Sequence, residues 1–187
     1  MKIKRGGLAM YAILIPYVTT PLGDCLLMEV RSALVPQPGE VCFPGGKIEE
    51  GENAVTAAIR ETCEELGLDA SAITILHSLP PERMEDGREI FPIKARISES
   101  SLKNLRLSSE EVAKTFLLPL SWLQENPPKI FQLPAPDYTL LPSLLQGYLS
   151  HYAPFTNTHA TYYWEYEGHG IWGMTARVIN RLLSSMS

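Results

Sequence analysis

Runs and alternations of apolar residues predict a set of short strands around one well-marked helix. The predicted strands fall at 8–18, 25–30, 73–79, 90–97 and 112–118, followed by a hairpin of 161–166 and 169–172. Helical periodicity without Gly or Pro predicts a helix over 53–66 that ends at Gly67, a short helix over 120–124 and a closing amphipathic helix over 175–184. Strands around a central helix, with another helix at the end, indicate the α/β or α+β class with a mixed sheet.

Two stretches lack this regular periodicity. Residues 36–51 are rich in Pro, Gly and charge, and they are interrupted by the apolar piece 41–43, which predicts a long structured loop. Residues 126–154 combine six prolines with interleaved aromatics and leucines, which predicts an ordered insertion rather than a linker. At about 150 residues per domain, the chain is expected to be a single domain over 1–187 that carries this insertion.

The N-terminus permits two interpretations. Basic residues within positions 2–5 precede the apolar run 8–18, which is the outline of a signal peptide. No small-residue cleavage site follows this run; a turn-forming stretch at 19–24 and a second strand-like run come next. Two strands joined by a turn are therefore the favoured interpretation. No other run approaches the ~18 apolar residues of a membrane span.

Composition and charge exclude several classes of protein. Apolar residues make up 45% of the chain and charged residues 20%, so a disordered, collagenous or coiled-coil protein is excluded. The net charge of −5 argues against a general nucleic-acid binder. The cysteines Cys25, Cys42 and Cys63 form no C-x-x-C pair, and their odd number fits no disulfide framework. We therefore expect a cytoplasmic protein without membrane or nucleic-acid partners, and its oligomeric state, a homodimer included, is open.

The strongest chemical signal is an acidic face on the helix predicted at 53–66. At about 100° per residue, Glu61, Glu64 and Glu65 share an arc of about 100°. Arg60 is predicted to lie off this face. The predicted core stripe lies on the opposite side and consists of Val55, Ile59, Thr62 and Leu66. An exposed, solvated acidic face is the ordinary interpretation of such a cluster.

Three observations favour a cation site instead. The carboxylates repel one another at i, i+3 and i+4, with no basic residue on their face to relieve them. They lie at the C-terminal end of the helix, where the helix dipole disfavours anions. The same face carries Ala54, Ala57 and Ala58, which indicates the close approach of backbone or of a ligand. Oxygen ligands favour Mg²⁺, Mn²⁺ or Ca²⁺ over zinc, and ligands on a helix do not fit the calcium loop of an EF-hand.

A resemblance to the Nudix hydrolases is carried by the stretch GGKIEEGENAVTAAIRETCEELGL, residues 45–68. The family pattern is G-x5-E-x7-R-E-U-x-E-E-x-G-U, where U is a bulky aliphatic residue. Its fixed positions are matched by Gly46, Glu52, Arg60, Glu61, Glu64, Glu65, Gly67 and Leu68. Thr62 departs from the pattern at the first U, where we expect its hydroxyl to bond the carbonyl of Ala58 at small cost. The resemblance implies a Nudix-type α/β/α sandwich with a mixed β-sheet.

The resemblance also implies a role for each matched residue. Three glutamates would be catalytic and would bind Mg²⁺ or Mn²⁺, together with one backbone carbonyl. These implied metal ligands are Gly45, Glu61, Glu64 and Glu65. Glu52 and Arg60 would form a structural ion pair that ties the loop to the helix. The general base is left open among Glu64, Glu61 and a glutamate from a later loop.

The flanks of the signature resemble the coenzyme A pyrophosphatase branch of the family. The matching residues are Leu27, Arg31, Ser32, Gly39, Phe43, Pro44, Gly45 and Gly46, and the segments 110–123 and 162–179 also match. Two departures are a missing residue between Ser32 and Gly39, and Val35 in place of a second arginine. The resemblance implies that Arg31 and Ser32 bind a small-molecule diphosphate. Coenzyme A or its derivatives would give 4′-phosphopantetheine and adenosine 3′,5′-bisphosphate.

Other interpretations remain open for the substrate and for two further groups of residues. The substrate could be ADP-ribose, NADH or a nucleotide, or the chain could be a nucleotide-sensing module, although its intact metal glutamates favour an enzyme. The charged loop 80–89 is either solvated or a source of substrate and catalytic side chains. The tryptophans at 122, 164 and 172 are predicted to pack in the core or the hairpin rather than to form a stacking platform.

Overall fold

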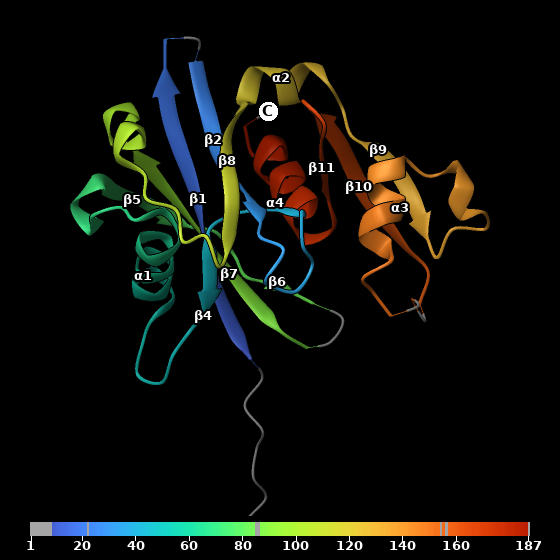
Figure 1. Cartoon of the computed structure of the whole chain (residues 1–187), viewed down its shortest axis with the longest axis horizontal. Coiled ribbons are helices and arrows are strands. Elements are labelled where there is room, and N and C mark those ends of the chain that lie inside the picture. Colours follow the sequence, from blue (N-terminus) through green and yellow to red (C-terminus); the bar gives the residue numbers. More distant parts are fainter. Residues whose placement is uncertain (1–8, 22, 85–86, 154, 156, 187) are drawn as a thin grey trace, which may run out of the picture. The chain divides into compact units, whose positions relative to one another are not determined.

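The computed structural model describes residues 9–21, 23–84, 87–153, 155 and 157–186 (Figure 1). Its contacts divide the chain into two compact units. The first unit is Met1–Val18 with Pro44–Arg106, and the second is Thr19–Phe43 with Leu107–Ser187. The basic residues on which the signal-peptide interpretation depends lie outside the described residues. No helix in the described part of the chain is long and apolar enough to cross a membrane.

The first unit is built on a mixed sheet. Its strands are β1 (Met10–Thr20), β4 (Gly45–Lys47), β5 (Ile73–Ser78), β6 (Glu82–Arg83) and β7 (Glu89–Ile97), with short 3-10 turns at Ala70–Ala72 and Glu99–Asn104. β1 runs parallel to β7 and antiparallel to β4, whereas β5 and β6 pair antiparallel with β7. Strand β1 is buried on both faces along most of its length, and Leu14, Ile15 and, on β7, Ile97 are fully buried. The mixed sheet predicted from the sequence is confirmed.

The helix of the first unit, α1 (Ala54–Leu66), packs on β4. It begins after Asn53, whose side chain accepts from the Thr56 N–H at 3.0 Å, and it ends at Gly67 in the left-handed region, with φ 63°. Ala57 and Ala58 are fully buried, so the small-residue face meets the protein itself.

The core stripe predicted for α1 is only partly right. Leu66 and Thr62 are buried, and the Thr62 hydroxyl donates to the Ala58 carbonyl at 2.7 Å, as expected. Val55 and Ile59 are only half-buried. The helix therefore turns Ala57 and Ala58, which are fully buried, further into the protein than Val55 and Ile59.

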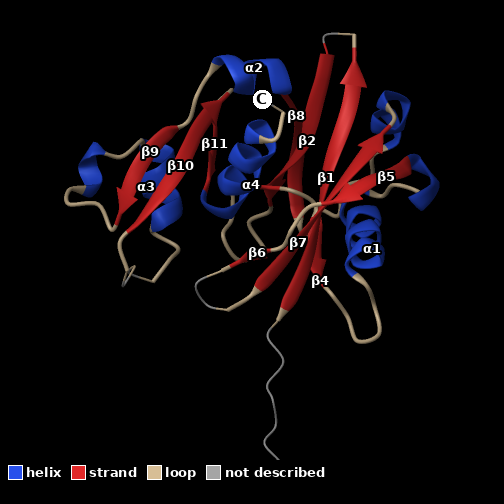
Figure 2. Cartoon of the chain, turned by 180° about the vertical axis from the view of Figure 1, so that it is seen from behind, coloured by secondary structure: helices blue, strands red, loops and turns tan. Residues whose placement is uncertain are grey.

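The described part of the second unit is built from antiparallel strand pairs and helices (Figure 2). Strand β2 pairs with β3 and with β8, and β10 lies between β9 and β11 in a three-stranded sheet. The strands are β2 (Gly23–Arg31), β3 (Val41–Cys42), β8 (Val112–Pro119), β9 (Lys129–Leu133), β10 (His159–Tyr166) and β11 (His169–Trp172). The helices are α2 (Leu120–Glu125), α3 (Ser143–Leu149) and α4 (Gly173–Ser184), with a 3-10 turn at Tyr138–Leu140.

Residues 126–153 of the Pro-rich stretch belong to this second unit. They supply β9 and α3, which enclose a cluster of buried side chains. The buried members are Leu133, Leu141, Leu145, Tyr148, Leu149, Tyr163 and Trp172. Trp164 is also buried, and its Nε1 donates to the carbonyl of Asn126 at 2.7 Å. The packing role predicted for Trp164 and Trp172 is confirmed.

Candidate active site

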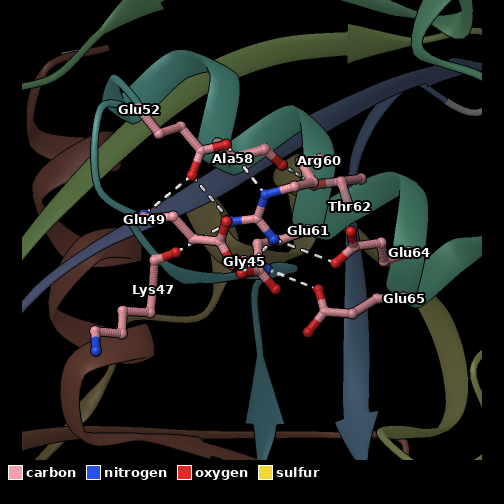
Figure 3. A network of polar contacts seen from close by, with 10 residues as sticks. All are labelled: Gly45, Lys47, Glu49, Glu52, Ala58, Arg60, Glu61, Thr62, Glu64 and Glu65. Carbon is pink, nitrogen blue, oxygen red and sulfur yellow. Dashed lines mark hydrogen bonds and ion pairs between the residues drawn. The ribbon is translucent and has the colours of Figure 1, made fainter.

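Arg60 lies at the centre of a polar network on α1 (Figure 3). Its Nε and Nη2 donate to the two carboxylate oxygens of Glu52, each at 3.0 Å, and Nη2 also donates to the carbonyl of Lys47 at 3.1 Å. The Glu49 N–H donates to Glu52 Oε2 at 3.1 Å. Because Arg60 donates to the carboxylate, the pKa of Glu52 lies below its ordinary value. This pair ties the glycine-rich loop to the helix, as the resemblance implies.

Arg60 also contacts two of the predicted metal glutamates. Its Nη1 donates to Glu61 Oε1 at 2.9 Å and to Glu64 Oε2 at 3.2 Å. The expectation that Arg60 lies off the carboxylate face, leaving the cluster without a basic partner, is therefore wrong. A helical wheel gives the direction of the Cβ atom, whereas the long stem of arginine carries its guanidinium across to the neighbouring face. In this structure Arg60 balances part of the like-charge repulsion.

The three glutamates differ in their surroundings. Glu65 is buried, and its Oε2 accepts from the Gly45 N–H at 2.8 Å, so it fixes the residue whose carbonyl is the expected further ligand. The Glu61 side chain is 18% exposed and that of Glu64 is 57% exposed. The cluster thus has one anchored carboxylate, one half-enclosed and one that reaches the solvent.

Gly46 lies directly against the carboxylate of Glu61. A Cβ atom at position 46 would overlap the carboxylate carbon and both of its oxygens. A glycine is therefore needed at position 46 to leave room for the Glu61 carboxylate. This requirement does not depend on which cation the carboxylate binds.

Gly46→Ala is expected to push the Glu61 carboxylate aside and to weaken Mn²⁺ binding by about tenfold, the scale of losing one well-placed contact. Calorimetric titration with Mn²⁺ measures this. Gly147→Ala is the matched control, because a Cβ atom there meets nothing within 4 Å. Equal Mn²⁺ affinity in the Gly46 variant and in the control would show that Glu61 takes no part in holding the ion.

The chemistry of the donors suits a divalent cation. Three carboxylates and a glycine backbone lie on or beside one helix, and oxygen donors of this kind are preferred by Mg²⁺ and Mn²⁺. Among the residues that the structure describes, no three acidic, histidine or cysteine side chains converge on one ion position. Arg60 instead supplies the positive charge between Glu61 and Glu64. A bound cation would therefore compete with Arg60 for these oxygens.

The two residues expected to bind substrate belong to the second unit and differ from each other. Arg31 ends β2 and is half-buried, and its Nε donates to the carbonyl of Pro36 at 2.8 Å. Ser32 is 4% exposed, its hydroxyl donates to the carbonyl of Glu110, and it also accepts from the Leu34 N–H. The Ser32 hydroxyl thus already bonds two backbone groups of the protein, and Arg31 is the remaining candidate for binding substrate.

The charged loop 80–89 is only partly described. Arg83 and Glu89 form an ion pair at 2.6 Å across the β6–β7 pairing, with the Arg83 side chain 73% exposed. This exposed ion pair fits the first of the two interpretations of the loop, that its charged side chains are solvated. Glu85 and Asp86 lie outside the described residues.

Glu40 was not predicted from the sequence as a residue of interest. It precedes β3 and is 8% exposed, and its carboxylate accepts hydrogen bonds from Tyr152 and Trp172. The available signal was an acidic residue directly before the apolar piece 41–43. Its partners, however, come from positions more than a hundred residues later, which no local pattern predicts.

Comparisons with known proteins identify one family for this chain. A sequence profile described as the NUDIX domain matches residues 9–140. The chain is 33% identical to Nudix hydrolase 3 of Caenorhabditis elegans over 182 residues, which cover 94% of this chain and 72% of that protein. It is 30% identical over 172 residues to the uncharacterized Nudix hydrolase NudL of Escherichia coli K12, covering 91% and 79%.

Two solved structures share the fold. An Ap4A hydrolase of C. elegans in a binary complex matches with a TM-score of 0.52 at 23% identity, over 61% of this chain and 83% of that chain. The MutT protein from Methanosarcina mazei Go1 matches with a TM-score of 0.50 at 15% identity, over 78% and 93%. Both support the mixed α+β fold. From the family profile and the relatives together, the chain belongs to the Nudix family and is a pyrophosphohydrolase of that family.

Proposed function

We propose that this enzyme hydrolyses the diphosphate of coenzyme A or its derivatives with Mg²⁺ or Mn²⁺. The observation that carries the metal dependence is the cluster of Glu61, Glu64 and Glu65 on α1, where Arg60 pairs with Glu61 and Glu64. Water would add to one phosphorus and the bridging P–O bond would break, which gives 4′-phosphopantetheine and adenosine 3′,5′-bisphosphate. The cation would neutralise charge on the diphosphate oxygens.

The residues of α1 would divide the work according to their surroundings. Glu65 and Glu61 would hold the cation, since both are enclosed, and Glu65 would also fix Gly45. Glu64 is the most exposed of the three and is our candidate to accept the proton of the attacking water. Glu52 and Arg60 would keep the loop in place.

The coenzyme A proposal rests on Arg31 and on its flanking matches to that branch. Among the described residues, the Nη1 and Nη2 atoms of Arg31 make no hydrogen bond, so the guanidinium fork is available to an anion. Our candidate for contacting the pantetheine arm is the apolar surface of 130–152, where Ile130 and Leu140 are exposed. The three free cysteines support a reducing compartment such as the cytoplasm.

Arg31→Ala is expected to raise KM for coenzyme A at least tenfold, because losing one charge-assisted phosphate contact costs about 1.5–3 kcal/mol. The effect on ADP-ribose, which lacks the 3′-phosphate, should be much smaller. The measurement is kcat/KM for both substrates in the wild type and in the variant. Arg181→Ala, on the exposed face of α4, controls for the loss of one positive charge. A wild type that prefers ADP-ribose, or an equal loss for both substrates, would favour a different diphosphate substrate.

A further inference from the structure

Glu40 is a buried acid that the proposed chemistry does not use. Its Oε2 accepts from the Tyr152 hydroxyl and from Trp172 Nε1, each at 3.1 Å. Its Oε1 is buried and makes no hydrogen bond to any described residue. Burying a carboxyl group with one unpaired oxygen costs free energy, so a residue with only a packing role would be better served by an apolar side chain.

The two donors come from different elements around one aromatic cluster. Tyr152 follows α3 in the Pro-rich insertion, and Trp172 ends β11. The rings of Tyr152 and Trp172 meet edge to face with centroids 5.1 Å apart, and Tyr148 of α3 stacks on Trp172 at 6.4 Å. Glu40 therefore connects the insertion and the hairpin through a single carboxylate oxygen.

The backbone of Glu40 lies opposite Arg31. The Arg31 N–H donates to the Glu40 carbonyl at 2.9 Å, and the Gly39 N–H donates to the Arg31 carbonyl at 3.0 Å. These two bonds close the loop 32–39 at its base. The hydrogen bonds that hold the side chain of Glu40 therefore also help to fix the backbone of Arg31.

We propose that Glu40 is a positioning residue that joins the Pro-rich insertion to the loop of Arg31, so that these two elements form one binding surface. The mechanical coupling between Tyr152 and the loop stands on the geometry alone. Its consequence for substrate binding rests on the function proposed for Arg31.

The charge of Glu40 makes the stability of this contact depend on pH, whereas an apolar residue at position 40 would not. Burial raises the pKa of Glu40 to about 7, because the loss of hydration outweighs the bonds from Tyr152 and Trp172 and the attraction of Arg31. Among the described residues, the hydroxyl of Tyr148 on α3 also interacts with Glu40. Since the folded protein holds this proton more tightly than the unfolded chain, the contribution to stability is full below pH 4.5 and is lost as the pH rises through 7.

Hydrogen exchange tests the coupling without any substrate. In Tyr152→Phe, which changes only the insertion, the amides of Arg31 and Gly39 should exchange at least ~10-fold faster, the scale of one lost hydrogen bond. Tyr163→Phe is the matched control, because it removes a tyrosine–carboxylate bond of 2.9 Å to Glu165 in the same unit. Unchanged exchange at Arg31 and Gly39 in Tyr152→Phe would overturn the proposal, and so would equal acceleration in the control.

Variants at position 40 test two further points, the effect of Glu40 on substrate binding and the effect of its charge on stability. Glu40→Gln retains an acceptor for Tyr152 and Trp172, so its KM for coenzyme A should stay within about twofold, whereas Glu40→Leu should raise KM about tenfold with little change in kcat. The melting temperature of the wild type, relative to Glu40→Gln, should fall between pH 5 and pH 8. A flat difference, or a Glu40→Leu variant that loses kcat rather than KM, would count against the positioning role. A wild type that does not cleave coenzyme A would refute the proposed function, and the exchange result would still decide the coupling.

Discussion

Glu64→Gln is expected to lower kcat by about 100-fold or more, as when a metal ion loses a charged ligand or the attacking water loses its base. The fold should be unaffected, because Glu64 is exposed and, among the described residues, its carboxylate bonds only Arg60, at 3.2 Å. Initial rates at saturating Mg²⁺, together with a thermal melt, separate the two effects. The exposed Glu50, on the preceding loop, offers Glu50→Gln as the matched control.

Glu65→Gln should lose activity on the same scale, together with some stability. Its carboxylate is buried and holds the Gly45 N–H, and an amide oxygen accepts that bond less strongly than a charged oxygen does. Turnover near that of the wild type in both glutamine variants would mean that the carboxylates of α1 are not the catalytic centre.

Arg60→Ala is expected to destabilise the protein by about 2 kcal/mol, which for a chain of this length lowers Tm by roughly 5 °C. The variant loses the bidentate pair with Glu52 and leaves Glu61 and Glu64 without their internal counterion. Glu52→Gln should shift Tm in the same direction, since it loses the same pair but keeps Arg60 beside the metal glutamates.

Divalent metal separates the two roles of Arg60. Mg²⁺ should recover more of the lost Tm in Arg60→Ala than in Glu52→Gln, because only the alanine variant has gained an unbalanced like-charge cluster. The measurement is a pair of melts per protein, one with chelator and one with millimolar Mg²⁺. If Mg²⁺ raises the Tm of both variants equally, Arg60 does not act as a counterion to the cluster.

Local sequence rules predicted which face of α1 the three glutamates share better than they predicted the electrostatics of that face. The spacing of Glu61, Glu64 and Glu65 determines which side of α1 they share, because helix geometry depends only on residue spacing. The wheel could not show that the guanidinium of Arg60 turns back over the same carboxylates. Side-chain length and tertiary position decide that contact.

Outside the signature, too, elements that follow from local patterns were predicted, and elements that depend on tertiary contacts were not. β1, β7 and α1 follow from apolar runs and helical periodicity, with ends displaced by a residue or two. The strand β9 and helix α3 were not predicted within 126–154, because the prolines around them interrupt the local patterns. The pairing of β9 with β10 and the buried cluster stabilise them, and both are tertiary contacts. Glu40 escaped notice for the same reason, since its partners are distant along the chain.

The proposed activity is measured by incubating the purified protein with coenzyme A and separating the products by chromatography. With Mg²⁺ or Mn²⁺ we expect 4′-phosphopantetheine and adenosine 3′,5′-bisphosphate in equal amounts, and neither product in the presence of a chelator. ADP-ribose, NADH and nucleotides in parallel reactions should be cleaved more slowly. Intact coenzyme A alongside rapid cleavage of one of these substrates would show that coenzyme A is not the substrate, and products that form equally with chelator would show that no divalent cation is needed.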